Sequence, residues 1–198
     1  METLLAVAGL ITVGAITPGP NNFIVLRTAA RSGLAGALPA VAGVVLGGLG
    51  LLAVATAGGA ALFSSLPGFR LVLALGGCLY LAWLGFRLIA DSFTERADAA
   101  DAAKWPPGVT GLAGFQFLNP KSWVLVLTAV AAMPTQGTSA FLQLAALFLI
   151  IPASCLLLWS WFGALMMRAL EDSRMSSWFD RAMGGTLAAS AAFLFASA

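Results

Sequence analysis

The asparagines of this chain are the residues whose placement most strongly indicates chemistry. The chain contains three, and each stands in an apolar stretch beside a proline. Asn21 and Asn22 follow Pro20, and Asn119 precedes Pro120. Proline removes a backbone donor and interrupts the helical hydrogen-bond ladder, and the interior of a membrane holds no water to replace that bond. A helix broken in such surroundings needs polar partners, so we expect both breaks to line a cavity.

Lys121 adds a charge to the second of these breaks. It is one of two lysines in the chain, and an ammonium inside an apolar span is costly unless it faces a cavity or a partner. No Asp or Glu lies well inside a predicted span, which makes a substrate carboxylate its expected counter-charge. The alternative is that the side chain of Lys121 extends its charge to the cytoplasmic interface. The nearby groups that accept from an ammonium or donate to a carboxylate belong to Thr17, Asn21, Asn22 and Asn119, a set that suits a zwitterion.

The residues that are missing or scarce exclude other chemistry. The sequence has no histidine, and its two cysteines, Cys78 and Cys155, lie in apolar stretches. A transition-metal cage of Cys and His ligands is therefore not indicated, and we expect no cofactor. A Ser or Thr nucleophile would have only Lys121 as its base. We accordingly expect a protein that is not an enzyme and that has no nucleic-acid partner.

Composition places these residues in a lipid bilayer. Hydrophobic residues make up 60% of the 198, the mean hydropathy is +0.95, and 9% of residues are charged, against about 25% in soluble domains. At roughly 20 residues for each crossing, the chain has room for about six spans. The predicted spans are Leu4 to Leu26, Gly36 to Leu62, Phe69 to Ala90, Val109 to Met133, Phe141 to Met167 and Trp178 to Ser197.

The two proline motifs occupy matching places in this arrangement. Each falls in the first helix of a three-span half, and two halves of three spans must cross the membrane in opposite senses. The sequence thus predicts an all-α membrane protein, a single transporter domain over 1–198, built as a 3+3 inverted repeat with broken first and fourth helices. The repeats are 1–90 and 109–198, joined by a cytoplasmic loop at 91–108. In such transporters the broken helices meet near the midplane and bind substrate. For either motif alone, a kink that only serves packing is the alternative.

The distribution of basic residues predicts the orientation. Eight of the ten Lys and Arg residues fall in or beside connections on one side of the membrane. Only Arg70 lies in an opposite loop. Because basic loops stay in the cytoplasm, we expect both termini outside, and we interpret the charged connections at 91–104 and 168–181 as solvated cytoplasmic loops.

Two further features concern packing. Small residues recur at intervals of three or four along the second span, which predicts a close helix contact. We favour a contact inside the bundle, and a homodimer seam is the alternative. Among the aromatic residues, Tyr80 is the one we expect beside a cavity. The small residues are Gly36, Ala40, Gly43, Gly47 and Gly50.

Three motifs resemble the lysine exporter (LysE) superfamily, especially its threonine and homoserine-lactone exporter (RhtB) branch. They are Thr17-Pro18-Gly19-Pro20-Asn21-Asn22, Tyr80-Leu81-Ala82-Trp83-Leu84-Gly85 and Gln116-Phe117-Leu118-Asn119-Pro120-Lys121-Ser122-Trp123. The likeness covers the whole chain. It implies an exporter of amino acids or their derivatives in the bacterial inner membrane, driven by the proton motive force. From these motifs we predict substrate contacts at Thr17, Pro18, Gly19, Pro20, Asn21, Asn22, Tyr80, Gln116, Asn119, Pro120 and Lys121.

The resemblance also indicates a class of substrate. The doubled asparagine is most similar to the cysteine and O-acetylserine exporters of that branch. Members that export cationic amino acids tend to carry an acidic residue in the second span, and this chain has none there. We therefore expect a neutral zwitterion of the cysteine, O-acetylserine, threonine or homoserine type, moved by alternating access.

Two other functions remain open at this stage. A divalent-metal efflux protein would need carboxylate or thiolate ligands in its spans, and this sequence offers almost none. A transmembrane thiol/disulfide electron carrier with repeated halves would need cysteines at equivalent positions. Cys78 follows Asn21 by 57 residues, whereas Cys155 follows Asn119 by 36, so the two are not equivalent.

Overall fold

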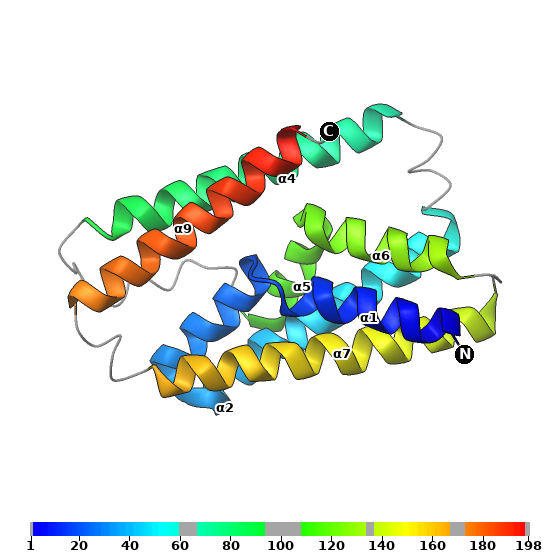
Figure 1. The fold of residues 1–198 in the computed structure, drawn as a ribbon, viewed down its shortest axis with the longest axis horizontal. Helices are drawn as coiled ribbons and strands as arrows, with labels where there is room; N and C mark the ends of the chain where they lie inside the picture. Colours follow the sequence, from blue (N-terminus) through cyan, green and yellow to red (C-terminus); the bar gives the residue numbers. More distant parts are fainter. Residues whose placement is uncertain (1, 60–66, 94–107, 134–136, 167–172, 197–198) are drawn as a thin grey trace.

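The computed structural model describes residues 2–59, 67–93, 108–133, 137–166 and 173–196 (Figure 1). Most of the predicted cytoplasmic loop and the end of the second predicted span lie outside these residues. The described part forms seven α-helices and one short π-helical segment. They are α1 (Glu2–Ile16), α2 (Pro20–Val54), η1 (Ala55–Gly59), α4 (Pro67–Asp91), α5 (Gly108–Leu118), α6 (Pro120–Ala132), α7 (Thr138–Leu165) and α9 (Ser173–Ala196).

Both helices that were predicted to be broken are interrupted at their proline motifs. The first break separates α1 from α2, and the second separates α5 from α6. Each new helix begins with a proline, which needs no backbone donor in the first turn and has its φ already set for a helix. Gly19 precedes α2 in an extended conformation, and Asn119 precedes α6 in a similar one.

Two predicted boundaries were wrong. We expected a loop between the first and second spans, but α2 runs through this region and departs from helical geometry only at Gly33, whose φ is 72°. Glycine adopts this left-handed conformation without the strain that a Cβ would add. The second error concerns the charged connection at 168–181, because α9 already begins at Ser173 and includes Arg174 and Arg181.

The helices are arranged as a group of five beside a pair. The long helices α2 and α7 pack together, α5 lies against α2, and α1 lies against α7. Figure 1 shows α4 and α9 running side by side, apart from the other helices. The N-terminus lies near the beginning of α7.

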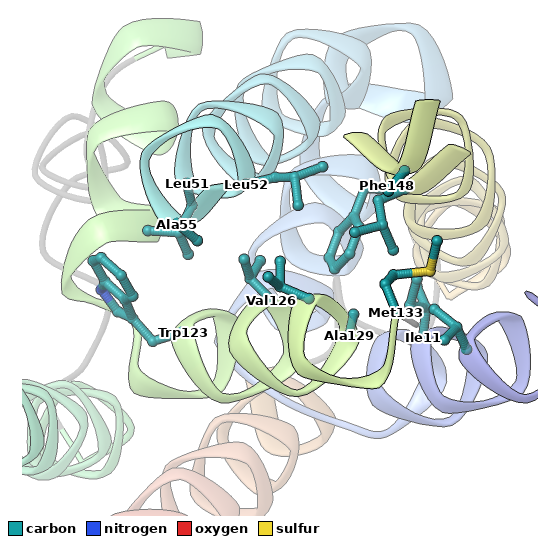
Figure 2. Packing of buried hydrophobic residues seen from close by; sticks show 13 residues of the cluster. Ile11, Leu51, Leu52, Ala55, Trp123, Val126, Ala129, Met133 and Phe148 are labelled. Atoms are coloured by element: carbon teal, nitrogen blue, oxygen red, sulfur yellow. The ribbon is translucent and has the colours of Figure 1, made fainter. Parts of the chain in front are cut away.

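A hydrophobic cluster holds four helices of the larger group together. Figure 2 shows Ile11 of α1, Leu52 of α2, Val126 of α6 and Phe148 of α7 pointing toward one another. Ile11 is fully buried, and the other three are 4% exposed or less. This cluster fixes α6 against α1 and α2, and it therefore sets the distance between the two breaks.

Judged by length and composition alone, two of the described helices could cross a membrane. They extend over Pro20–Gly58 and Thr138–Leu165. Three further helices beside the breaks, α1, α5 and α6, are apolar but shorter. The six spans and the 3+3 repeat therefore stay predictions.

The small-residue stripe of the second span makes an internal contact. A Cβ on Gly43 would lie 2.6 Å from the carbonyl oxygen of Val109, and one on Gly47 would lie 2.5 Å from that of Ala113. Both partners belong to α5. For these two glycines the expected contact inside the bundle is confirmed.

Gly163 of α7 makes a still closer approach, and it gives a prediction about stability. A Cβ there would lie 2.1 Å from the carbonyl oxygen of Leu26 in α2, so Gly163→Val must separate the two helices. We expect a loss of about 1–3 kcal/mol or more in the free energy of unfolding, measured by thermal denaturation in detergent. Gly185→Val is the matched control, because its added Cβ meets no neighbouring helix within 4 Å in the described part of the chain. Equal melting temperatures for the two variants would contradict the close packing of α2 and α7.

Candidate functional site

Lys121 connects the two breaks. Its ammonium donates to the backbone carbonyl oxygen of Thr17 at 2.7 Å and lies 3.5 Å from that of Pro18. These carbonyls follow the C-terminal end of α1, where the helix dipole is negative, and the last turn of α1 contains no basic residue. A cation from the second predicted half thus stabilises the broken end of a helix in the first. The ammonium contacts the break instead of extending away from it.

Asn22 and Trp159 satisfy other carbonyls at this end of α1. The side-chain amide of Asn22 donates to the carbonyl oxygens of Ala15 and Thr17, each at 2.9 Å. The indole N–H of Trp159, in α7, donates to Ile16 at 3.2 Å. The last carbonyls of a helix have no backbone N–H partners within that helix, so these side chains replace the missing hydrogen bonds. Asn22 is only 4% exposed, which fits a structural role.

Asn21 and Gln116 form a second connection between the breaks. Their amides bond reciprocally: the Nδ2 of Asn21 donates to the Oε1 of Gln116 at 2.9 Å, and the Nε2 of Gln116 donates back at 3.0 Å. The hydroxyl of Ser122 also donates to the Oε1 of Gln116, at 2.8 Å. Gln116 is 1% exposed, so this network is shielded from solvent on one side. The start of α2 is thereby tied to the last turn of α5.

Asn119 has one polar group in use and one without a partner. Its Oδ1 accepts from the backbone N–H of Lys121 at 3.1 Å and so caps α6. Its Nδ2 is buried and has no hydrogen-bond partner among the described residues, and Asn119 is 1% exposed. An unpaired buried donor costs about 1–3 kcal/mol, which a ligand that accepts from it would recover.

A cavity lies between the two breaks. Its empty volume, including the open mouth, is about 620 Å³. The first turns of α2 and of α6 both contribute residues to its lining. Its lining combines polar residues, here called the polar wall, with aliphatic residues, here called the aliphatic wall. The polar wall includes Asn21, Gln116, Asn119, Lys121 and Ser122, and the aliphatic wall includes Val44, Val45, Leu125, Val126 and Leu156; Phe148 also lines the cavity.

Comparison with known protein families identifies the class of this molecule. Residues 12–197 match the family described as LysE type translocator. The chain belongs to this family. The match contains both breaks and the whole cavity lining, so the superfamily predicted from the three motifs is confirmed.

Individual relatives of this LysE type translocator are efflux proteins. The chain is 32% identical to a leucine efflux protein of Enterobacter sp. (strain 638), over 80% of this chain and 78% of that one. It is 27% identical to a cysteine/O-acetylserine efflux protein of Salmonella typhimurium, over 80% and 81%. A leucine efflux protein of Klebsiella pneumoniae is 37% identical, but that alignment covers 46% of this chain and 43% of the relative. No solved structure matches the chain significantly.

The structure of the translocator brings most of the predicted contact residues to the cavity. Seven of them line it: Gly19, Pro20, Asn21, Asn22, Gln116, Asn119 and Lys121. Thr17 and Pro18 contribute carbonyls to Lys121, and Pro120 is buried at the start of α6. Tyr80 does not line this cavity. Its ring packs against Phe115 and Trp83, with centroids 5.2 and 5.8 Å apart.

Several cavity residues were not predicted from the sequence. Ser122 was not among the predicted contacts although it belongs to the third motif, and Phe148 and Leu156 are apolar residues with no distinguishing signal. Pro152 lines the cavity and lies inside α7, so a proline within the fifth predicted span was the signal available for that helix. Outside the cavity, Asp180 of the predicted charged connection at 168–181 is 6% exposed and pairs with Arg27 at 2.6 Å, a partnership that was not predicted.

The reciprocal amide pair predicts a non-additive effect on transport. Asn21→Ala and Gln116→Ala each remove both bonds, so each single variant should lose most of what the double variant loses. We expect a coupling free energy of about 0.5–3 kcal/mol in a double-mutant cycle on efflux rates. As a control, Asn21→Ala combined with Gly185→Val should be additive, because Gly185 lies in α9 and lines no part of the cavity. Additive losses in the first cycle would contradict a functional Asn21–Gln116 pair.

Proposed function

We propose that this protein exports neutral amino acids or their close derivatives across the bacterial inner membrane. In this proposal it has six spans in a 3+3 inverted repeat, both termini lie outside, and the proton motive force drives alternating access. The observation that carries the proposal is the cavity between the breaks, which combines two helix N-termini, the Lys121 ammonium and the unpaired Nδ2 of Asn119.

The substrate carboxylate binds near the start of α6. Helix N-termini carry partial positive charge and free N–H groups, which makes them suited to anions. The Nδ2 of Asn119 supplies a donor there. Lys121 uses its ammonium on the carbonyls of Thr17 and Pro18, and an ammonium has three donors, so one remains for the carboxylate.

The substrate ammonium binds to the amide pair. The Oε1 of Gln116 already accepts two bonds, from Asn21 and Ser122, whereas the Oδ1 of Asn21 accepts one, from Gln116. An amide oxygen has two lone pairs, so Asn21 retains capacity to accept. Asn21 is thus the ammonium contact, and Asn22 is occupied by the carbonyls of the break.

The substrate side chain faces the aliphatic wall. This wall contains no ionisable group, so a charged side chain would lose its hydration without a counter-charge. A neutral side chain avoids this cost. The names of the relatives, leucine efflux protein and cysteine/O-acetylserine efflux protein, support a small neutral zwitterion.

Uptake into inverted vesicles tests this function. The parent protein should accumulate radiolabelled leucine, cysteine or O-acetylserine when a proton gradient is imposed, and it should not accumulate lysine. A protonophore should abolish the accumulation. Vesicles without the protein give the background. Uptake of no neutral amino acid by folded parent protein would overturn the proposal.

The two other functions have less support. Among the described residues, no group of three or more His, Cys, Asp or Glu is placed to hold a metal ion. Cys78 and Cys155 are buried free thiols on α4 and α7, and neither lines the cavity.

Replacement of both cysteines separates thiol chemistry from transport. We expect Cys78→Ser/Cys155→Ser to keep the efflux rate of the parent within about twofold, because both thiols act as small buried side chains. An electron carrier would lose all activity in the same variant. The assay is efflux of the best substrate from preloaded cells, normalised to the amount of protein in the membrane.

A further inference from the structure

The packing of α4 against α9 creates a unit separate from the other helices. Gly85 and Gly184 bring the two backbones together, and a Cβ on either would lie 2.6 Å from the carbonyl oxygen of the other. By comparison, α4 packs only slightly against α5 and α6 (Figure 1). These helices are the third spans of the two predicted halves. The packing therefore groups the third spans together, and it does not divide the molecule between 1–90 and 109–198.

A small set of side chains attaches this pair to α2. Arg27 of α2 forms a salt bridge with Asp180 of α9 at 2.6 Å. The two side chains are 20% and 9% exposed. One turn before Arg27 on α2, the ring of Phe23 stacks on that of Phe179 of α9, with centroids 5.9 Å apart. Leu187 of α9 is fully buried in the same hydrophobic cluster.

The position of the salt bridge relates it to the cavity. Arg27 follows Pro20 by seven residues, so it lies about 10 Å along α2 from the break. Arg31 and Arg174 belong to the same predicted cytoplasmic group of basic residues, which places the salt bridge between the cavity and the cytoplasm.

We propose that the Arg27–Asp180 salt bridge is a latch that closes the cytoplasmic side of the cavity by holding the α4–α9 pair against α2. It opens once in each transport cycle, when the pair moves as a unit. This step rests on the proposed export function. A salt bridge suits the task because its strength depends on water: the attraction is large while the contact is dry and falls steeply once water enters. The closed arrangement is therefore stabilised while water is excluded, and the open arrangement persists once water has entered the contact.

Thiol labelling measures the latch without any substrate. In the Cys78→Ser/Cys155→Ser background, Ser122→Cys places a reporter in the cavity, and inverted vesicles expose the cytoplasmic side to a membrane-impermeant maleimide. We expect Asp180→Asn and Arg27→Gln each to raise the labelling rate about tenfold, the factor for about 1.4 kcal/mol of lost latch stability. The exchange Arg27→Asp/Asp180→Arg should return the rate toward that of the parent.

Arg181→Gln is the matched control. Arg181 is the next residue of α9, and its Nε donates to the hydroxyl of Ser92 at 3.0 Å, just beyond the end of α4. Its guanidinium also lies 4.0 Å from the ring centroid of Phe93. Both contacts are within the α4–α9 unit, so this variant should label at the rate of the parent.

Cross-linking tests the movement itself. The variant Arg27→Cys/Asp180→Cys is made in the Cys78→Ser/Cys155→Ser background, without the Ser122→Cys reporter. Joining its two cysteines with a short reducible bis-thiosulfonate should stop efflux, and a reductant should restore it. Unchanged labelling in both single latch variants, or full efflux after complete cross-linking, would overturn the latch. Because labelling requires no transported molecule, a failure of the latch is distinguishable from a failure of the export function.

Discussion

Lys121→Met should reduce efflux by at least about 100-fold while the protein remains folded. Methionine keeps the length of the side chain but removes the charge that the proposed carboxylate contact needs. It also removes the donor to Thr17, so the broken end of α1 loses its cation. Hydrogen bonds to charged groups contribute about 1.5–3 kcal/mol each, and two such losses give a reduction of this size. The measurement is the initial rate of substrate uptake into inverted vesicles, with folding checked by thermal denaturation.

The second lysine of the chain gives the control for Lys121. Lys104 lies in the predicted cytoplasmic loop, so Lys104→Met should transport at about the rate of the parent. Each of the two substitutions removes one positive charge, so the Lys104→Met and Lys121→Met proteins have the same net charge. Normal transport by Lys121→Met would show that this ammonium does not act on the substrate.

Asn119→Asp should weaken apparent substrate affinity by about 10- to 100-fold and leave thermal stability close to that of the parent. Aspartate keeps the oxygen that caps α6 at the N–H of Lys121, but it has no Nδ2 to donate. It also places a negative charge where the proposed carboxylate binds. Asn119→Ala should lose the same donor and, in addition, the cap, which contributes about 1 kcal/mol. The concentration dependence of transport and the melting temperature separate these two effects.

Asn119→Ser controls for the added charge. Serine is neutral and caps helices well, yet its side chain is too short to place a donor where the Nδ2 lies. We expect stability near that of the parent and the same loss of affinity as in the aspartate variant. If the serine variant binds substrate as the parent does, the unpaired Nδ2 is not a substrate contact.

The sequence could predict the breaks because their cause is local. A proline beside an asparagine favours the interruption of a helix through local geometry, and a cap at Asn119 needs only the residues that follow. The predicted bounds of the third span, Phe69 to Ala90, likewise lie within two residues of α4. Apolar helices that end in charged or turn-forming residues are identified by composition alone.

Features that depend on tertiary packing were not predicted. The loop expected after Leu26 was wrong because Arg27 and Arg31 mimic a solvated connection, whereas Ala29 and Ala30 between them are buried. The partner of Arg27 lies 153 residues away, so no local pattern reveals it. The aliphatic wall of the cavity consists of residue types that also fill every core and face every lipid.

Substrate counterflow in proteoliposomes tests the central claim most directly. Purified parent protein, reconstituted and loaded with unlabelled leucine or cysteine, should take up the same radiolabelled amino acid transiently against its gradient, with no proton gradient present. Lys121→Met and Asn119→Asp proteoliposomes should show almost none, and Lys104→Met should behave as the parent. Counterflow of equal size in the parent and in both site variants would contradict a substrate site between the two breaks.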